Sequence, residues 1–304
     1  MLSFEKYHGL GNDFIIFKEV DLLKKFKHIQ SGWDLDREYS KLAQGVCHRN
    51  TGIGADGMIV LKMLSTDMVE MMFYNQDGSR VPMCGNGIRC FSHFIYENKI
   101  LEGNIYKIKT LAGVLTVEIS IEDGFKAKVN MGDPLFQLES IPMDKENFLQ
   151  LLKTDSDCKN MDIDEGINYK LKLDSKEYTL SSVFMGTTHT VIFVDELNDE
   201  EIKEDGKRIE NNSIFPKKTN VNFVKIRDRE NIEMKTWERG AGLTLACGTG
   251  ACSAVVIGNM KLNILDKKVK VHLPIGELFI ELNESVYMTG PSELISKGVY
   301  YEKI

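Results

Sequence analysis

The sequence has no long hydrophobic segment and no excess of positive charge, and both absences exclude classes of function. Its longest apolar stretch, around residues 250–258, is far too short to span a bilayer. The formal net charge is −7, whereas a nucleic-acid surface needs clustered Lys and Arg. The opening MLSFEKYHGLGNDF lacks the basic stretch and apolar core of a signal peptide, so we expect a cytoplasmic protein with no membrane or nucleic-acid partner.

Cysteine is scarce, and none of the six cysteines lies in a C-x-x-C pair or at the spacing of a zinc site. In a reducing cytosol all six should be free thiols. Metal is therefore not expected, and the Gly-rich segments HGLGN and GIGADG have neither the GxGxxG nor the Walker pattern of a phosphate loop. Four cysteines have no functional motif and are interpreted as structural: Cys47, Cys90, Cys158 and Cys252.

With 304 residues the chain is long for a single core, so two domains are expected. Two of its segments resemble each other without a gap: VEMMFYNQDGSRVPMCGNG (69–87) and IEMKTWERGAGLTLACGTG (232–250). In this alignment Cys84 meets Cys247, 163 residues later. Such internal similarity predicts two domains of one architecture, related by duplication.

Each copy predicts the same local structure. Alternating apolar residues in VEMMFY and IEMKTW predict a strand, and a Gly-containing turn follows. Cys-Gly-x-Gly then opens a helix, IRCFSHFIYE or ACSAVVIGNM, and the second is apolar on nearly every face, as in a buried helix. Further strands are predicted at GVLTVEISI, FKAKVNM, HTVIFVD, VNFVKI and KVKVHL. The pattern indicates an α+β protein of two similar sheet-wrapped units.

The Cys-Gly-x-Gly turn indicates the chemistry. A cysteine at a helix N-terminus has its thiolate stabilised by unpaired backbone N–H groups and the helix dipole. The same N–H groups can bind a carboxylate, and the glycines admit a ligand close to the backbone. Two such turns could hold one α-carboxylate with a thiol on each face of the α-carbon. One thiolate would remove the α-proton and the other thiol would return one to the opposite face, which inverts the centre.

We therefore predict that Cys84 and Cys247 are the acid–base pair of an amino-acid racemase or epimerase. Two alternatives are buried structural cysteines and a redox pair in a non-enzymatic thiol or binding protein. The matching context of the two turns speaks against both alternatives.

Several long motifs resemble those of the diaminopimelate epimerases, over nearly the whole chain. They are HGLGNDF (8–14), TGIGADG (51–57), NQDGSRVPMCGNGIRC (75–90), FPKKTNVNF (215–223), WERGAG (237–242), LACGTGAC (245–252) and YMTG (287–290). The resemblance implies two pseudo-symmetric domains, each a β-barrel wrapped around a central helix, with the active site in the cleft between them and no pyridoxal phosphate or metal. The domains would be residues 1–131 plus 285–304, and residues 132–284. It also implies a homodimer, with Tyr287 near the subunit contact.

The resemblance also implies roles for individual residues. Cys84 and Cys247 match the two acid–base cysteines, and His189 and Glu238 match residues that tune them. The helix-end groups that hold the reacting carboxylate match Gly85, Asn86, Gly248 and Thr249. Residues that hold the rest of the substrate match Asn12, Asn75, Asn220, Glu238 and Arg239. The fork of Arg239 suits a carboxylate and Glu238 suits an ammonium group.

Three departures from the family pattern affect substrate choice. The run Gly186-Thr187-Thr188-His189 replaces the usual Asn-Pro before the histidine, so Thr187 offers only a hydroxyl to the substrate. Leu243 stands where an acid is expected, and the polar stretch from about residue 144 to 178 is interpreted as a surface excursion.

The substrate expected first is LL-diaminopimelate, epimerised to the meso form, or the related lanthionine. The alternative is a single-centre amino acid such as histidine. A fold relative that isomerises another carbon acid without two cysteines fits the paired thiols poorly.

Overall fold

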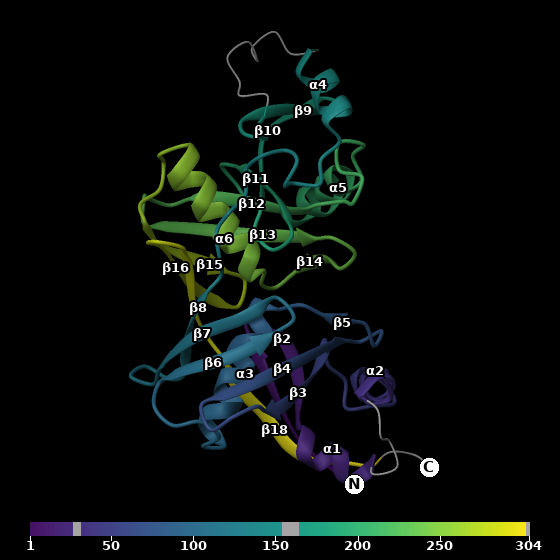
Figure 1. Ribbon diagram of the computed structural model, residues 1–304. Helices are drawn as coiled ribbons and strands as arrows, with labels where there is room; N and C mark the ends of the chain where they lie inside the picture. The colour runs from purple at the N-terminus through teal and green to yellow at the C-terminus, as the bar shows by residue number, and fades with distance from the viewer. Residues whose placement is uncertain (27–31, 154–163, 302–304) are drawn as a thin grey trace. The chain divides into compact units, whose positions relative to one another are not determined.

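The computed structural model describes residues 1–26, 32–153 and 164–301, and the chain divides into two compact units (Figure 1). Unit 1 comprises Met1–Asn130 and Thr289–Ile304, and unit 2 comprises Met131–Met288. The predicted domain limits, 131/132 and 284/285, stay a prediction; the contacts change from one unit to the other at 130/131 and 288/289. Within the described residues no helix is long and apolar enough to cross a membrane.

Unit 1 is a strand-rich unit with three helices among its described residues. Its elements in chain order are β1 (Leu2–Gly9), β2 (Asn12–Lys18), α1 (Glu19–Lys25), α2 (Gly32–Cys47), β3 (Gly57–Met63), β4 (Met68–Asn75), β5 (Arg80–Val81), α3 (Gly85–Glu97), β6 (Ile105–Thr110), β7 (Gly113–Ser120), β8 (Lys126–Asn130) and β18 (Glu293–Tyr300). Each strand of the series β18, β1, β2, β3, β4, β6, β7, β8 pairs with the next. The pairs β2–β3 and β4–β6 are parallel, and the others are antiparallel.

Unit 2 repeats this plan. Its elements are α4 (Lys145–Lys153), β9 (Tyr169–Leu173), β10 (Lys176–Phe184), β11 (Thr188–Phe193), α5 (Asp199–Glu210), β12 (Asn220–Ile226), β13 (Asn231–Glu238), β14 (Gly242–Thr244), α6 (Gly248–Val256), a π-helical turn (Ile257–Lys261), β15 (Lys268–Leu273) and β16 (Gly276–Leu282), and β17 (Val286–Pro291) follows. The series β9, β10, β11, β12, β13, β15, β16 has parallel pairs at β11–β12 and β13–β15. These are the places that β2–β3 and β4–β6 hold in unit 1.

The predicted duplication is confirmed by the strand positions. The starts of β3 and β12, residues 57 and 220, are 163 residues apart, and so are those of β4 and β13, residues 68 and 231. The starts of β6 and β15, residues 105 and 268, have the same separation, as have Cys84 and Cys247.

Each sheet encloses one helix. In unit 1, α3 contacts β1 and β2 near one end of the series and β8 at the other, so the sheet curls around it. In unit 2, α6 contacts β11, β12 and β16, and eight of its residues are buried, as predicted for a helix that is apolar on nearly every face. The predicted α+β fold with a helix wrapped by strands is confirmed.

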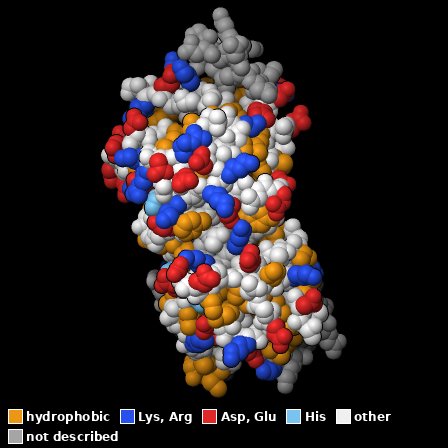
Figure 2. All heavy atoms as spheres, turned by 90° about the vertical axis from the view of Figure 1, so that its left-hand side faces the viewer, with side chains coloured by type: hydrophobic (Ala, Val, Ile, Leu, Met, Phe, Trp, Pro, Cys, Tyr) orange, Lys and Arg blue, Asp and Glu red, His pale blue; other side chains and the backbone are white. Residues whose placement is uncertain are grey.

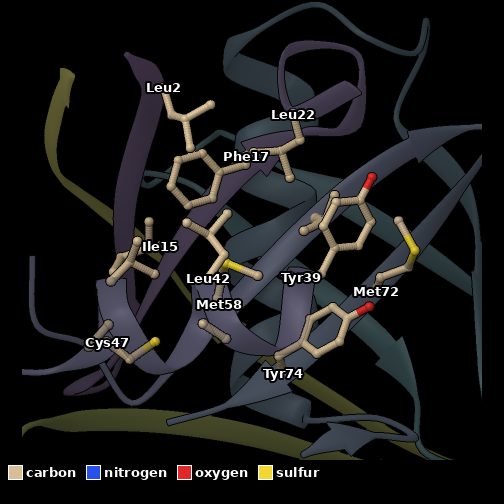
Figure 3. Close-up of a cluster of buried hydrophobic side chains, with 14 of the residues drawn as sticks. Leu2, Ile15, Phe17, Leu22, Tyr39, Leu42, Cys47, Met58, Met72 and Tyr74 are labelled. Carbon is tan, nitrogen blue, oxygen red and sulfur yellow. The ribbon is translucent and has the colours of Figure 1, made fainter. Parts of the chain in front are cut away.

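Three strands of unit 1, β2, β3 and β4, are buried on both faces. Side chains of β2, β3 and β4 pack against α1 and α2 on the face away from α3, and Ile15, Met58 and Tyr74 meet Leu22 and Leu42 there (Figure 3). The opposite faces of these strands lie toward α3, where Met71 and Ile59 approach Gly87. Burial on two faces explains why β3 is a continuous apolar run rather than an alternating one.

The interpretation of residues 144–178 as a surface excursion is wrong for the part that the structure describes. Phe148 of α4 and Tyr169 and Leu171 of β9 are buried and belong to the core cluster of unit 2. The exposed lysines of these elements hide this contribution, because composition alone does not show which face of an element is covered. Residues 154–163, including Cys158, lie outside the described residues.

Cys47, Cys90 and Cys252 are buried and form no disulfide, as interpreted from the sequence. On the surface shown in Figure 2, Lys and Arg are interspersed with Asp and Glu.

Candidate functional site

Cys84 is the N-cap residue of α3. Its backbone is extended, with φ −141° and ψ 122°, and its sulfur accepts a hydrogen bond from the Gly87 N–H at 3.4 Å. The thiol is half-buried. A sulfur that accepts from a helix-end N–H is favoured in its thiolate form. This is the local geometry that the Cys-Gly-x-Gly turn predicts.

Cys247 is the N-cap residue of α6, but its sulfur has a different partner. No backbone N–H caps it from its own helix; the Thr249 hydroxyl lies 3.7 Å from Sγ instead. The residue is 5% exposed. The two cysteines therefore occupy equivalent places in the repeat and have different hydrogen-bond partners.

The second glycine of the Cys247 turn serves the fold. A Cβ at Gly250 would lie 2.2 Å from Asn222 Oδ1, closer than real contacts allow. The glycine expected to admit a ligand thus admits a side chain of β12. At the equivalent Gly87 the nearest atom, Met71 Cε, would lie 3.2 Å away.

Asn12 and Asn86 meet at the start of α3. The Asn86 amide donates to Asn12 Oδ1 at 2.6 Å, and the Asn12 amide donates to Asp56 at 3.2 Å. Asn86 Oδ1 is buried and has no hydrogen-bond partner within the described part of the chain. Gly85, beside Asn86 in the first turn of α3, is buried as well. Asn75 lies at the end of β4, where its amide donates to Ser79 at 3.0 Å.

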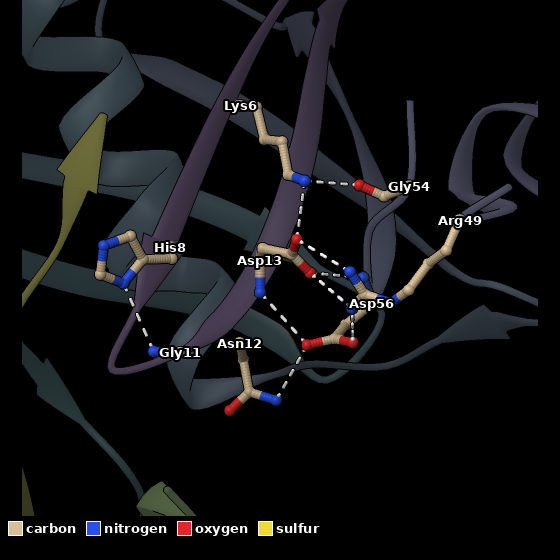
Figure 4. A network of polar contacts seen from close by, with 8 residues as sticks. All are labelled: Lys6, His8, Gly11, Asn12, Asp13, Arg49, Gly54 and Asp56. Atoms are coloured by element: carbon tan, nitrogen blue, oxygen red, sulfur yellow. Dashed lines mark hydrogen bonds and ion pairs between the residues drawn. The ribbon is translucent and has the colours of Figure 1, made fainter. Parts of the chain in front are cut away.

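An ionic cluster behind Asn12 was missed by the sequence reasoning (Figure 4). Asp13 lies 2.8 Å from Lys6 Nζ and 3.0 Å from Arg49 Nη2, and Arg49 also binds Asp56 at 2.7 Å. The Asp56 N–H donates to Asp13 at 2.9 Å. Burial alone would raise the pKa of Asp13, but the hydrogen bonds from Lys6 and Arg49 outweigh it and hold the pKa below its usual value. The cluster fixes the acceptor that orients the Asn12 amide.

Four predicted residues of unit 2 form one hydrogen-bonded set. The Asn220 amide donates to the Thr187 hydroxyl at 3.2 Å, and Thr187 Oγ lies 3.0 Å from His189 Nε2. The same nitrogen lies 2.9 Å from the hydroxyl of Thr249, next to Gly248 in the first turn of α6. The structure thus connects Thr187, His189, Asn220 and Thr249 to each other and, through Thr249, to Cys247.

Burial, aided by the charge of Arg239, lowers the pKa of His189 to about 3. The imidazole is therefore neutral at physiological pH and cannot act as a cationic acid.

Glu238 ends β13, and Arg239 follows it directly. The Arg239 N–H donates to Asn220 Oδ1 at 2.9 Å and its guanidinium to the Lys217 carbonyl at 2.9 Å, and the side chain is exposed. Glu238 accepts from the Thr244 hydroxyl at 2.6 Å.

Glu210 of α5, which the sequence did not indicate, holds this turn. It is 4% exposed and accepts from Trp237 Nε1 at 2.8 Å and from the Gly240 N–H at 3.3 Å.

Leu243 is a packing residue. It pairs with Trp237 across β13 and β14 and packs against the core cluster of unit 2.

Tyr287 in β17 is partly buried, and its hydroxyl donates to Glu284. Within the residues that the structure describes, no three His, Cys, Asp or Glu side chains come together as metal ligands would.

Comparisons with known proteins assign the chain to a family. The sequence profile described as diaminopimelate epimerase matches residues 4–136 and 181–295. A diaminopimelate epimerase from Halothermothrix orenii is 43% identical over 304 residues, with 98% of this chain and 97% of the relative covered. One from Alkaliphilus metalliredigens is 38% identical, with 100% and 99% covered.

The chain belongs to the diaminopimelate epimerase family. It is accordingly an isomerase, of the epimerase and racemase type. Every predicted site residue lies in the two stretches that the family profile matches. The intervening residues 137–180 include α4 and β9, the segment that the sequence marked as unusual.

Solved structures extend the family's fold to distant sequences. A hydroxyproline epimerase from Agrobacterium vitis, solved with bound trans-4-hydroxy-L-proline, has a TM-score of 0.65 at 11% identity and covers 98% of this chain and 90% of its own. A probable proline racemase from Agrobacterium radiobacter also has a TM-score of 0.65, at 12% identity, covering 100% and 94%. At such identities the likeness supports the fold alone.

Proposed function

We propose that the protein epimerises diaminopimelate between its LL and meso forms, with Cys84 and Cys247 as the two acid–base groups. The observation that carries the mechanism is that each cysteine is the N-cap of the central helix of one repeat. Support for the substrate comes from relatives named diaminopimelate epimerase, 43% and 38% identical over nearly their full length.

The helix ends supply binding and charge stabilisation. Backbone N–H groups in the first turns of α3 and α6, which have no carbonyl partner within their helix, are suited to the α-carboxylate of an amino acid. As the α-proton leaves, negative charge grows on that carboxylate, and the same donors stabilise it. These donors are the groups proposed to stabilise the electron pair that the leaving proton sets free.

Proton transfer needs one thiolate and one thiol. In one direction a thiolate takes the α-proton, and the C–H electron pair moves into the carboxylate. The opposite thiol then gives its proton to the other face of the carbon and becomes the thiolate. The two cysteines exchange roles when the substrate has the opposite configuration.

Exchange of the α-proton with solvent deuterium tests the substrate. We expect LL-diaminopimelate to exchange at its α-carbon at least about a hundredfold faster than L-histidine. Histidine lacks the second amino-acid end, so polar groups of the site that bind this end would be left unpaired. Lanthionine, which has the same two amino-acid ends, is included in the panel. NMR or mass spectrometry measures the incorporation. Faster exchange of histidine than of diaminopimelate contradicts the proposed substrate.

The Thr187 hydroxyl is proposed to donate to the substrate. Its oxygen accepts from the Asn220 amide and lies 3.0 Å from His189 Nε2, and when that nitrogen carries a proton the hydroxyl proton is available for a substrate acceptor. Thr187→Val should raise the KM for diaminopimelate about tenfold, the value of one lost hydrogen bond, with a smaller change in kcat. Thr187→Ser keeps the hydroxyl and is the matched control. Equal KM values for the two variants would remove Thr187 from the binding site.

A cytoplasmic location and a homodimer complete the proposal. Both thiols must stay reduced, which favours a reducing compartment. Tyr287 is partly exposed in the single chain and leaves ring surface for a subunit contact. Cell fractionation and a light-scattering mass test the two points; a secreted protein or a 34.5 kDa particle contradicts them.

A further inference from the structure

A layer of three buried polar side chains lies beneath the Cys247 helix. His189 of β11 and Asn222 of β12 are 0% exposed, and Thr236 of β13 is 2% exposed. They come from three adjacent strands, and two of these, β11 and β12, contact α6. Burying such groups is unfavourable unless each finds a hydrogen-bond partner.

The other repeat shows that the fold does not need these polar groups. The 163-residue separation places Ile59 at the position of Asn222 and Phe73 at that of Thr236. Phe14 takes the place of His189, because it pairs with Gly57 as His189 pairs with Asn220.

All three side chains of unit 1 are apolar and buried, and the Phe14 and Phe73 rings meet edge to face at 5.6 Å. A layer made of apolar side chains thus supports the same sheet and helix in unit 1. Packing therefore does not require the polar version in unit 2, which instead connects to the Cys247 sulfur through His189 and Thr249.

The amide of Asn222 fixes the proton positions of the layer. Its Nδ2 donates to the Thr190 carbonyl at 3.0 Å, and a carbonyl can only accept, so the orientation of the amide is determined. Its Oδ1 accepts from the Thr236 hydroxyl at 3.0 Å. The second Nδ2 hydrogen points to His189 Nδ1, 3.2 Å away. Nδ1 must then be the acceptor, and the neutral imidazole carries its proton on Nε2.

The Nε2 proton sets the direction of the contacts that follow. Nε2 lies 2.9 Å from the Thr249 oxygen and 3.0 Å from the Thr187 oxygen, and a protonated Nε2 can donate to these hydroxyls but cannot accept from either. The hydroxyl hydrogen of Thr249 is then available to the Cys247 sulfur at 3.7 Å. Read in order, Asn222 donates to His189, His189 to Thr249, and Thr249 to the sulfur.

We propose that Asn222 is a positioning residue, which holds His189 in its Nε2-protonated form so that the Thr249 hydroxyl donates to the Cys247 thiolate. The inference rests on the proposed function in taking Cys247 as an acid–base group. Gly250 belongs to the same device, because any side chain there would collide with Asn222.

Two charged residues at the end of β13, Arg239 and Glu238, do not take over the role of Asn222 in orienting the His189 proton. Arg239 acts on the imidazole from the end of β13 and disfavours a second proton on it, and Glu238 beside it is engaged by Thr244. The imidazole therefore acts as a neutral donor, whose direction depends on Asn222.

The first test needs no substitution at Asn222. In wild-type protein with ¹⁵N-labelled histidine, the ring-nitrogen shifts of His189 should show a protonated Nε2 and a bare Nδ1 from about pH 6 to pH 9. A His189→Gln variant assigns the signal. A protonated Nδ1, or an imidazolium in this range, overturns the proposal whether or not any variant folds.

The second test is the reactivity of the thiol. Asn222→Leu removes the donor with little change in volume, and it should lower the rate of Cys247 alkylation by iodoacetamide at neutral pH about tenfold. Peptide mass spectrometry also gives the rate at Cys84, whose sulfur accepts from the Gly87 N–H and should change less than about twofold.

Thr236→Val is the matched control, since it removes a buried hydroxyl from the same layer but leaves both Asn222 donors. It should keep the His189 signature and the alkylation rate. An unchanged Cys247 rate in Asn222→Leu, or an equal fall in Thr236→Val, overturns the proposal. Neither readout uses turnover, so loss of the proposed substrate activity alone would contradict the function and leave this inference standing.

Discussion

Replacing Cys84 or Cys247 by serine should lower the rate of diaminopimelate epimerisation by about a thousandfold, within the range that a positioned general acid or base contributes. A serine hydroxyl keeps nearly the same shape but ionises far less readily than a thiol, so neither removal nor return of the α-proton would proceed efficiently. Stopped-time assays in both directions, LL to meso and meso to LL, measure the effect.

The cysteine result separates an enzyme from a binding or redox protein. Calorimetric titration of each serine variant with diaminopimelate should still give binding, because the N–H groups of the helix ends remain. Cys252→Ala, in the same helix as Cys247 but buried in the core, is the control and should retain most of the activity. Serine variants as active as this control would contradict the two-base mechanism.

Asp13→Asn should destabilise unit 1 by about 2 kcal/mol and weaken substrate binding. The Asp13 side chain is 11% exposed and joins Lys6, 15% exposed, to Arg49, 54% exposed. Removing one charge leaves the Lys6 ammonium partly buried without its carboxylate, a loss of 3–5 kcal/mol in fully buried pairs that solvent at Arg49 reduces. Asp56 would lose the carboxylate that accepts from its N–H, and the Asn12 amide would no longer have an acceptor held in a fixed position.

The same carboxylate predicts how stability depends on pH. The pKa of folded Asp13 lies below its usual value, so its contribution is complete above the unfolded pKa of about 4 and is lost as pH falls through the folded pKa. Urea titrations of wild type and Asp13→Asn should therefore converge at acid pH and diverge toward neutrality. Asp123→Asn is the control, since that carboxylate is 86% exposed and should change stability by less than about 0.5 kcal/mol. A constant difference between the curves across pH would rule out the ion pairs as the cause.

The repeat and its central helices could be predicted because their signals are local. Alternation in β4 and β13 and the Cys-Gly-x-Gly turns before α3 and α6 lie in short stretches that align without a gap. Even β9 has the strand pattern YKLKL, although the polar composition of residues 144–178 suggested a surface excursion.

The ionic cluster behind Asn12 was not predictable in this way. Asp13 and Asp56 are 43 residues apart and meet only because β2 and β3 pair in parallel, with Phe14 opposite Gly57. Nothing in either segment specifies that register. The NDF and GADG motifs indicated the acids but not their shared role.

The polar layer under α6 escaped detection for another reason. Asn222 in VNFVKI reads as an ordinary polar residue of a half-exposed strand, yet it is fully buried. Only the comparison with Ile59 of the other repeat, at a known strand register, shows that it breaks the apolar pattern.

The different partners of the two sulfurs have a consequence for the enzyme between turnovers. A main-chain N–H, as at Gly87, can only donate, so it binds a Cys84 thiolate strongly and a neutral thiol, whose sulfur is a weak acceptor, weakly. The Thr249 hydroxyl can rotate about its C–O bond, so it can donate to a Cys247 thiolate and accept from a Cys247 thiol. The two proton-bearing forms of the free enzyme should therefore differ in stability, although the configurations that they accept are mirror images at the reacting carbon.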